Sequence, residues 1–219
     1  MRLLIGNRNY SSWSLRPWLV MAHFELPFDE EVLLLNGDGW KERLVERSPT
    51  GRVPVLIDGD LAVSESIAII EYLAEKFPDK AIWPAGIGER ALARAASAEM
   101  HAGFSDLRRV APMNMRASLP GRGPLDDLSP SLHRLETLWG DCLEKSGGPF
   151  LFGGFSAVDA MFAPVASRIR TYQLPVSDTA AGYVEAIHAL PAFQTWLADA
   201  VSEPWIVEED EIDMSSGAR

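Results

Sequence analysis

Residues 51–77, GRVPVLIDGDLAVSESIAIIEYLAEKF, constrain the fold more than any other stretch of this chain. Apolar residues alternate from Val53 to Ile57, and a second short apolar run follows at residues 61–63. The Asp58-Gly59 pair between these runs favours a two-residue hairpin turn. Ser64 is a suitable cap for a helix with inward positions at Ile67, Ile70, Leu73 and Phe77. The stretch therefore predicts strand, turn, strand and helix in direct succession.

Two features of this stretch suggest a ligand site. Pro54 cannot donate to a sheet ladder, so it predicts either an edge strand or a special conformation. One such conformation is a cis Val53–Pro54 peptide, which would turn the Val53 backbone towards a ligand. The first-turn N–H groups of the following helix have no internal partner, so they favour a carboxylate, and the Ser66 hydroxyl could add a donor. The alternative is a hairpin packed on a capped helix, without any ligand.

The order VPVL, DG, SES and EYL resembles the glutathione-binding half of cytosolic glutathione S-transferases. This resemblance implies that Val53, before a cis Pro54, pairs its backbone with the cysteinyl part of glutathione. It also implies that Glu65 and Ser66 hold the γ-glutamyl amine and carboxylate. The resemblance extends over essentially the whole chain, most clearly over residues 9–77 and 150–165.

The composition limits which kinds of partner and which cellular compartment we expect for this protein. The net charge of −11 and the pI of about 4.8 argue against nucleic acid or an anionic membrane as the main partner. Cys142 is the single cysteine, so no intrachain disulfide can form and a reducing compartment fits. With no signal peptide pattern and no apolar run of membrane-spanning length, we expect a cytoplasmic protein. No metal is expected, because metal-ligand spacing is missing among His23, His101, His133 and His188.

The first third of the chain predicts alternating strands and helices. Strands are expected at Arg2–Ile5 and residues 28–35, and helices at residues 14–24 and 41–46. Together with the hairpin and capped helix, they give the order β-α-β-α-β-β-α, which matches a thioredoxin-like α/β layer. We expect this domain to span residues 1–78, followed by a linker at residues 79–88 that breaks every periodicity.

The remainder, residues 89–219, predicts an all-helical domain. Ser156 and Asp159 form a capping signature for one of its helices, and residues 112–124 form an irregular loop. The expected helices cover residues 89–111, 129–146, 156–171, 178–189 and 191–202. An α/β thioredoxin-like domain followed by an all-α domain is again similar to glutathione S-transferase architecture, in which the second domain completes the electrophile site.

Residues 9–17, NYSSWSLRP, carry the candidate catalytic hydroxyls at the first strand-to-helix junction. A hydroxyl donor at a helix N-terminus lowers the pKa of a bound thiol and so activates it. Tyr10, Ser11, Ser12 and Ser14 all compete for this role, although Ser12 or Ser14 could simply cap the helix.

The pattern Ser-Ser-x-Ser-x-Arg is similar to the active-site segment of zeta- and theta-like transferases. That resemblance implies that Ser11 contacts the glutathione sulfur, with Ser12 beside it and Arg16 at the arginine of the motif. The chain departs from the zeta pattern at Trp13, where those enzymes carry cysteine.

The resemblance also implies the rest of the binding site. Trp40 and Lys41 are expected at the glycine carboxylate of glutathione. The electrophile pocket is expected to contain Tyr10, Trp13, Met100, Phe104, Arg108 and Met113. Met and Phe at helical spacing are otherwise typical of plain core.

We therefore expect a glutathione transferase that conjugates the glutathione thiolate, as cosubstrate, to an apolar electrophile. The alternatives are a glutathione-dependent peroxidase, a zeta-type maleylacetoacetate isomerase and a non-catalytic glutathione-binding protein of the same fold. Transferases of this architecture usually form homodimers, and the helical faces at residues 67–77 and 89–111 would supply the contact.

Overall fold

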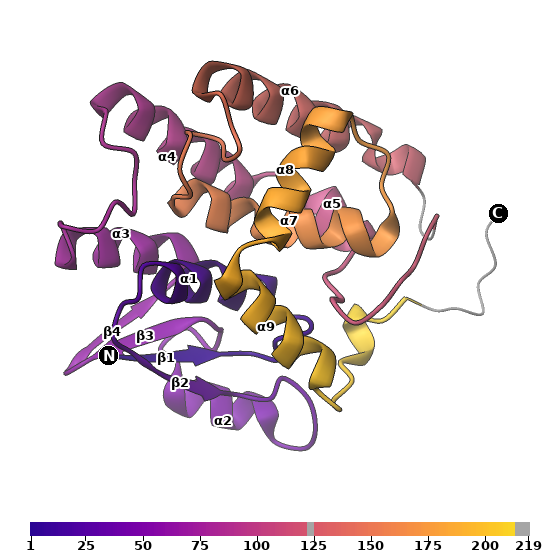
Figure 1. Ribbon diagram of the computed structural model, residues 1–219. Coiled ribbons are helices and arrows are strands. Elements are labelled where there is room, and N and C mark those ends of the chain that lie inside the picture. The colour runs from indigo at the N-terminus through magenta and orange to yellow at the C-terminus, as the bar shows by residue number, and fades with distance from the viewer. Residues whose placement is uncertain (122–124, 213–219) are drawn as a thin grey trace.

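The computed structural model describes residues 1–121 and 125–212. Its sheet has the strand order β2-β1-β3-β4, with β1 at Arg2–Ile5, β2 at Asp29–Val32, β3 at Val55–Asp58 and β4 at Leu61–Ser64. β1 and β2 run parallel, whereas β3 is antiparallel to β1 and to β4. Helices α1 (Ser12–His23), α2 (Trp40–Arg47) and α3 (Ser66–Lys76) accompany the sheet (Figure 1). This confirms the predicted thioredoxin-like layer.

The second domain is all-helical; most of it lies beyond α1 and α3 from the sheet, while its last helix lies beside α1 (Figure 1). Its helices are α4 (Ile87–Ala102), α5 (Ser105–Val110), α6 (Ser129–Ser146), α7 (Ala157–Tyr172), α8 (Asp178–His188) and α9 (Pro191–Ser202), with the 3-10 turns η1 (Leu125–Leu128) and η2 (Glu208–Asp210). Helix α7 is buried over nearly its whole length and packs against α1, α4 and α8. The core is therefore continuous between the two domains.

The predicted linker at residues 79–88 is packed rather than loose. Ile82 and Trp83 are buried, and the Ile82 carbonyl accepts a hydrogen bond of 2.7 Å from the Ala157 N–H at the start of α7. The expected division into residues 1–78 and 89–219 remains our proposal for the domain boundary, since the connection itself contributes to the core.

The hairpin forms as predicted, but its turn lies one residue later. Asp58 still pairs with Leu61, so the turn residues are Gly59 and Asp60, and Gly59 has φ +60°. The Asp58 carboxylate accepts a hydrogen bond of 2.6 Å from the Tyr72 hydroxyl, which holds Asp58 in the strand.

Pro54 does not lie in an edge strand. It immediately precedes β3, which is an inner strand of the sheet, and the Val53–Pro54 peptide is cis. Of the two expected options, the special conformation is the one present.

The predicted helix cap at Ser64 is wrong. Ser64 is the last residue of β4 and pairs with Val55, while Glu65 is the N-cap of α3 with φ +70°. The strand therefore ends at Ser64, directly before Glu65. The unusual backbone conformation of Glu65 alone changes the direction of the chain from strand β4 to helix α3.

The long helix expected over residues 89–111 is interrupted. Gly103 has an extended backbone and Phe104 has φ +55°, which separates α4 from α5. A Cβ at Gly103 would lie 2.9 Å from the Glu99 carbonyl oxygen, so the break depends on glycine. The Arg108 side chain donates to the Met100 carbonyl (3.3 Å) and to the Gly103 carbonyl (2.5 Å), which satisfies the end of α4.

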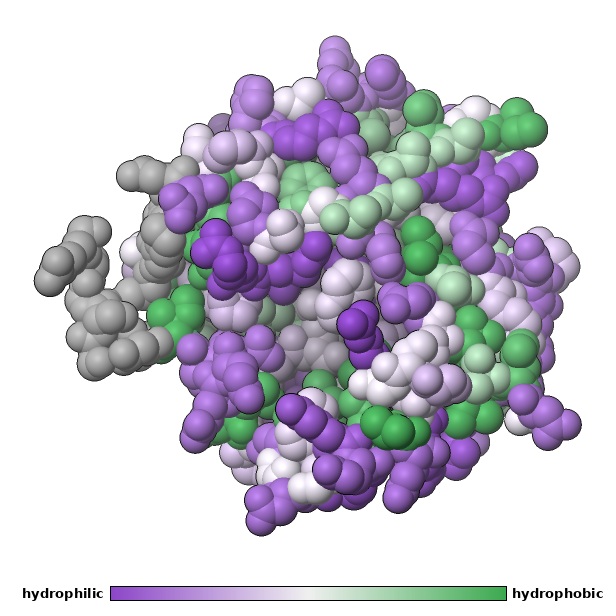
Figure 2. Space-filling view, turned by 180° about the vertical axis from the view of Figure 1, so that it is seen from behind, coloured by the Kyte–Doolittle hydropathy of each residue, from purple (hydrophilic) through white to green (hydrophobic). Residues whose placement is uncertain are grey.

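Figure 2 shows the face seen from behind, where hydrophilic residues dominate and hydrophobic side chains are scattered in small groups. Within the described part of the chain, the helices are too short or too polar to cross a bilayer.

The capping box at Ser156 and Asp159 is confirmed. The buried Asp159 carboxylate accepts hydrogen bonds from the N–H of Leu151 (3.0 Å), the N–H of Ser156 (2.9 Å) and the hydroxyl of Tyr183 (3.1 Å). Burial raises the pKa of Asp159 to about 6, against the opposing effect of these donors. The carboxylate thus caps α7 and ties two other segments, the connector at Leu151 and helix α8 at Tyr183, to the start of α7.

We expect Asp159→Ala to lower the free energy of unfolding by about 3 kcal/mol or more, because three buried donors lose their acceptor. Denaturant titration followed by circular dichroism measures this effect. Asp178→Ala is the matched control, since Asp178 also lies in the first turn of a helix but is exposed. Its effect should stay below about 1 kcal/mol. Equal losses in the two variants would contradict the role of Asp159.

Candidate functional site

Two adjoining cavities lie where the sheet domain meets the helical domain. We call the first, of 340 Å³, the interdomain cavity; its lining comprises Tyr10, Ser11, Ser12, Trp13, Leu35, Trp40, Leu44, Gly51, Arg52, Val53, Arg108, Pro112, Met113, Arg168 and Asp210. The second, of 320 Å³, is the α3 cavity, lined by Trp13, Thr50, Arg52, Val53, Pro54, Glu65, Ser66 and His101. Trp13, Arg52 and Val53 line both, so an elongated ligand could occupy the two together.

The α3 cavity ends at the N-terminus of helix α3. Ser66 is the first residue of α3; its side chain is buried, and its Oγ has no hydrogen-bond partner among the described residues. A buried hydroxyl without a partner is costly, so this geometry favours a ligand group that pairs with it. The free N–H groups of the first turn point to a carboxylate as that group.

Glu65 lies at the same end of the α3 cavity. Its carboxylate is half exposed and lies 3.8 Å from the His101 Nε2. Burial lowers the pKa of His101, and the neighbouring charge of Arg16 lowers it further. A mostly neutral His101 leaves the Glu65 carboxylate available to a ligand cation such as an amine.

Ser11 and Ser12 both line the interdomain cavity. Helix α1 begins at Ser12, two residues earlier than predicted, with Ser11 as N-cap but without a side-chain capping bond. The Ser11 hydroxyl donates a hydrogen bond of 2.7 Å to the Ser14 Oγ, which also accepts a hydrogen bond from the Gly6 N–H. Ser14 therefore has a structural role, and Ser11 and Ser12 are the two serines that lie both at the start of α1 and in the cavity lining.

Tyr10, the rival hydroxyl, is already engaged. Its hydroxyl donates to Glu211 and accepts from the Arg116 Nη2 at 2.9 Å. Burial and the Glu211 carboxylate raise the pKa of Tyr10. The Tyr10 hydroxyl therefore has hydrogen-bond partners on both sides, whereas the Ser11 hydroxyl has one such partner among the described residues, Ser14, to which it donates.

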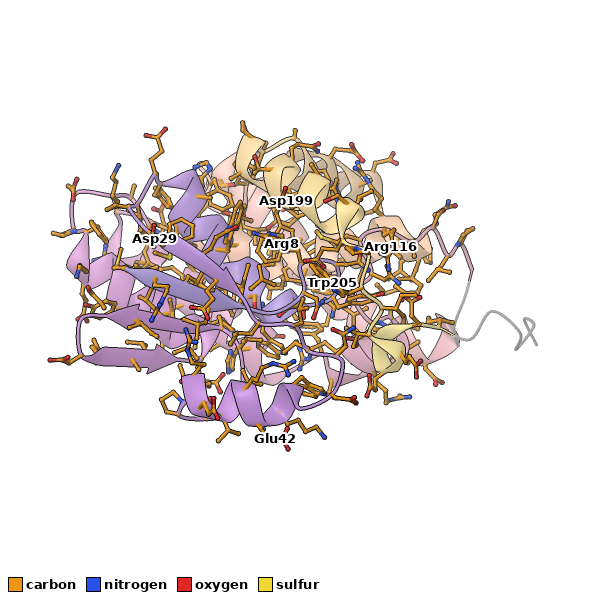
Figure 3. The ribbon with its side chains drawn as sticks, turned by 90° about the horizontal axis from the view of Figure 1, so that it is seen from below. Arg8, Asp29, Glu42, Arg116, Asp199 and Trp205 are labelled. Atoms are coloured by element: carbon orange, nitrogen blue, oxygen red, sulfur yellow. The ribbon has the colours of Figure 1, made fainter. Side chains whose placement is uncertain are left out.

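The chain after α9, residues 203–211, closes one side of the site, and we call it the C-terminal strap. The Glu203 carboxylate accepts hydrogen bonds from the N–H groups of Arg8 (2.8 Å) and Asn9 (3.1 Å). Arg116 donates to the Trp205 carbonyl at 3.5 Å, and the two residues lie near each other in Figure 3. The strap thus connects the loop before α1 with the helical domain.

Arg16 is fully buried beneath Trp13, with its guanidinium carbon 4.1 Å from the Trp13 ring centroid. None of its three nitrogens has a hydrogen-bond partner within the described ranges. Burial lowers the pKa of Arg16 well below its usual value, and the charges of Arg168 and Arg108 lower it further. Arg108 lies on the same indole, with its guanidinium carbon 5.4 Å from the ring centroid.

The structure does not bring all the predicted residues to the cavities. Met100 and Phe104 are packed in the hydrophobic core, as expected for apolar residues on an inward helical face, and line neither cavity. Trp40 lines the interdomain cavity, but Lys41 is exposed outside it, with its Nζ 5.5 Å from the Trp40 ring centroid. Tyr10, Trp13, Arg108 and Met113 line the interdomain cavity, and their role in binding an electrophile stays a prediction.

Sequence reasoning missed several lining residues. Arg52 could have been found from its position next to Val53-Pro54, but Arg168 and Asp210 reach the cavity only through the fold. Within the described residues, no group of three or more His, Cys, Asp and Glu side chains could hold a metal ion. Two larger hollows of 580 and 810 Å³ lie over α6, away from all these residues.

The chain resembles known proteins in both sequence and structure. It is 30% identical over 114 residues to glutathione S-transferase 1 of Dianthus caryophyllus, a match that covers 52% of this chain and 51% of that one. It is 26% identical to a probable maleylacetoacetate isomerase of Caenorhabditis elegans, covering 85% and 87%. The chain thus spans about half the length, or less, of several curated relatives that it matches.

Solved structures extend the likeness to the whole fold. A glutathione transferase homologue from Burkholderia, solved with bound glutathione, superposes with a TM-score of 0.69 at 27% identity, covering 91% of this chain and 97% of that one. Family models match at residues 10–76, described as the glutathione S-transferase N-terminal domain, and at residues 125–199, described as its C-terminal domain. Together these matches cover more than half of the chain, which therefore belongs to the glutathione S-transferase family.

Proposed function

We propose that this protein is a glutathione transferase in which Ser11 stabilises the thiolate of glutathione. The observation that carries this proposal is the pair of adjoining cavities: one holds the Ser66 hydroxyl, which has no hydrogen-bond partner among the described residues, and the other holds the Ser11 hydroxyl. The Burkholderia homologue contains glutathione, which supports the same ligand here.

In this proposal, glutathione extends from the α3 cavity into the interdomain cavity. Its γ-glutamyl carboxylate meets Ser66 and the N-terminus of α3, its amine meets Glu65, and its cysteinyl backbone pairs with Val53. The glycine carboxylate reaches the end of the interdomain cavity at Trp40 and Arg52.

The sulfur would then lie beside Ser11 at the start of α1. There the hydroxyl and the unpaired N–H groups of the helix favour the thiolate over the thiol. The thiolate attacks an electrophilic carbon, a C–S bond forms, and the leaving group departs with its electron pair while the thiol proton passes to solvent.

Cis–trans isomerisation is the second candidate. The Caenorhabditis elegans relative called a probable maleylacetoacetate isomerase covers 85% of this chain, which favours it. In such a reaction the thiolate adds to a double bond and is released again, so glutathione is not consumed. The concentration of free thiol during turnover therefore distinguishes the two reactions, since it stays constant in isomerisation and falls in conjugation.

We expect Ser66→Ala to weaken glutathione binding by about 1–2 kcal/mol, because a hydrogen bond to a charged carboxylate is lost. Isothermal calorimetry gives this value, and Glu65→Ala should cost at least as much. Ser97→Ala is the matched control, since the Ser97 hydroxyl is also buried without a described partner but lies outside both cavities. Unchanged affinity in both site variants would rule out this binding mode.

Ser11→Ala should reduce turnover by about 10²-fold, the usual effect of removing one donor from a developing or stabilised negative charge. The loss can be smaller, because a thiolate of higher pKa is also more nucleophilic. Glutathione affinity should change little, since the main binding contacts lie at Val53, Glu65 and Ser66. The pH–rate profile and the ultraviolet absorbance of the bound thiolate measure the two effects.

Tyr10→Phe and Ser12→Ala serve as comparisons for Ser11→Ala. If either of them raised the pKa of the bound thiol while Ser11→Ala left it unchanged, the donor would be that neighbour and not Ser11.

We also propose a homodimer formed through the outer face of α4 and the end of β4. Ile87 and Leu92 on α4 are 82% and 60% exposed, and Leu61 on β4 is 45% exposed. Leu92 lies on the face expected for assembly at residues 89–111, whereas Ile87 and Leu61 lie outside the expected faces, and together the three exposed apolar side chains suit a contact that excludes water.

Light scattering should therefore give twice the chain mass of 24.1 kDa at micromolar concentration. Leu92→Glu should shift the protein towards the monomer, because the contact would then bury an unpaired charge. Val45→Glu, at an exposed position on α2, should not. A wild-type mass equal to that of one chain would disprove the dimer.

A further inference from the structure

One end of the interdomain cavity is strongly positive. Arg168, on α7, is only 3% exposed and lines this cavity. Its Nε donates to the Ala111 carbonyl (2.7 Å) and its Nη1 to the Pro164 carbonyl (3.1 Å). These bonds fix the guanidinium group. Its Nη2 makes no hydrogen bond within residues 1–121 and 125–212, so one charged donor remains for whatever fills the cavity.

Arg108 adds a second cation to the same lining. It donates to two main-chain carbonyls, which use two of its five N–H donors and carry no charge to balance its own. Arg16 lies close enough for its charge to interact with those of both other arginines. In the described part of the chain, none of these three arginines has a carboxylate within 4.0 Å.

This concentration of positive charge is unusual for the protein. The chain as a whole carries a net charge of −11, and several of its other arginines, among them Arg47, Arg94 and Arg170, pair with carboxylates at the surface. Buried charges without a counterion are strongly disfavoured, so a site of this kind favours a bound anion.

Asp210 is the acidic residue among the described lining of the cavity, and it belongs to the C-terminal strap. It forms no ion pair with Arg168 within 4.0 Å. Burial raises the pKa of Asp210, whereas the charge of Arg168 lowers it. The Asp210 carboxylate therefore shares the cavity with Arg168 without contacting it, and a ligand anion can reach the arginine more closely than Asp210 does.

We propose that the arginine end of the interdomain cavity is an anion subsite, and that the electrophile carries a carboxylate or a similar anionic group bound by Arg168 and Arg108. This inference rests on the proposed function and specifies its second substrate. Trp13, Pro112 and Met113 supply apolar contacts for the rest of that molecule. Both carboxylates of glutathione are assigned elsewhere, to Ser66 and to the Trp40 end, so they do not satisfy these arginines.

Two chloronitroarenes test the proposal by turnover: neutral 1-chloro-2,4-dinitrobenzene and anionic 4-chloro-3,5-dinitrobenzoate. In each, the thiolate sulfur bonds to the ring carbon and chloride leaves with the bonding pair. After division by the uncatalysed rates, kcat/KM should favour the benzoate by about tenfold or more, as expected for a charge-assisted hydrogen bond. Equal values for the two electrophiles in the wild-type enzyme would overturn the proposal.

Variants assign the preference to the arginine. In Arg168→Gln the preference in kcat/KM for the benzoate should disappear, and in Arg168→Lys part of this preference should remain. Asp210→Asn should lower KM for the benzoate severalfold. Arg170→Gln is the matched control, because Arg170 lies on the same helix but is exposed and paired with Glu185, and it should leave the ratio unchanged. If Arg170→Gln lost the benzoate preference to the same extent as Arg168→Gln, the preference would arise from the overall charge of the protein, which would contradict the proposal.

A binding measurement separates failure of the subsite from failure of the proposed function. Calorimetry of 4-nitrobenzoate and neutral 4-nitrobenzamide, with the protein saturated by S-methylglutathione, requires no turnover. The benzoate should bind at least about tenfold more tightly to the wild type. If neither arene is conjugated but the benzoate binds with this preference, the subsite is supported and the conjugating activity is not. If conjugation occurs and neither experiment shows a carboxylate preference, the subsite is wrong.

Discussion

The position of the candidate site depends on the loop at residues 6–11, and side chains distant in sequence hold this loop in place. The Glu203 carboxylate accepts hydrogen bonds from the N–H groups of Arg8 and Asn9. The Asn9 side chain donates to Asn114 (2.9 Å) and accepts from the Arg116 N–H (2.8 Å). These are buried or partly buried hydrogen bonds, so breaking any of them would leave polar groups unpaired. The position of Ser11 is thus set by the helical domain as well as by its own.

Trp13 lies at the boundary between the two cavities. It lines both of them, and its indole contacts the guanidinium groups of Arg16 and Arg108 as well as the His101 ring, 5.2 Å between centroids. An aromatic face stabilises nearby cations that have no carboxylate partner. The departure from the zeta pattern at this position therefore replaces a small thiol with a wall that carries part of the positive charge at the site.

Local patterns predicted what local interactions determine. The β3–β4 hairpin followed from alternation and an Asp-Gly pair, and the start of α7 followed from Ser156 and Asp159. The strand-to-helix junction indicated a hydroxyl donor but left Tyr10, Ser11, Ser12 and Ser14 open, and only the resemblance to serine-type transferases singled out Ser11, which stays a prediction. The interruption at Phe104 was missed, since no residue near it forbids a helix and the break depends on packing around Gly103. Arg168 and Asp210 were missed because only tertiary structure brings α7 and the strap to the cavity.

Glu65 illustrates how stability and binding compete at a single residue. Its φ of +70° is a conformation that glycine adopts freely and that other residues adopt at a cost of about 1 kcal/mol or more. A sequence optimised only for folding would place glycine there, yet the carboxylate would then be missing from the α3 cavity. A redesign for stability that placed glycine at position 65 would therefore remove the proposed contact to the ligand amine, so position 65 should be held fixed.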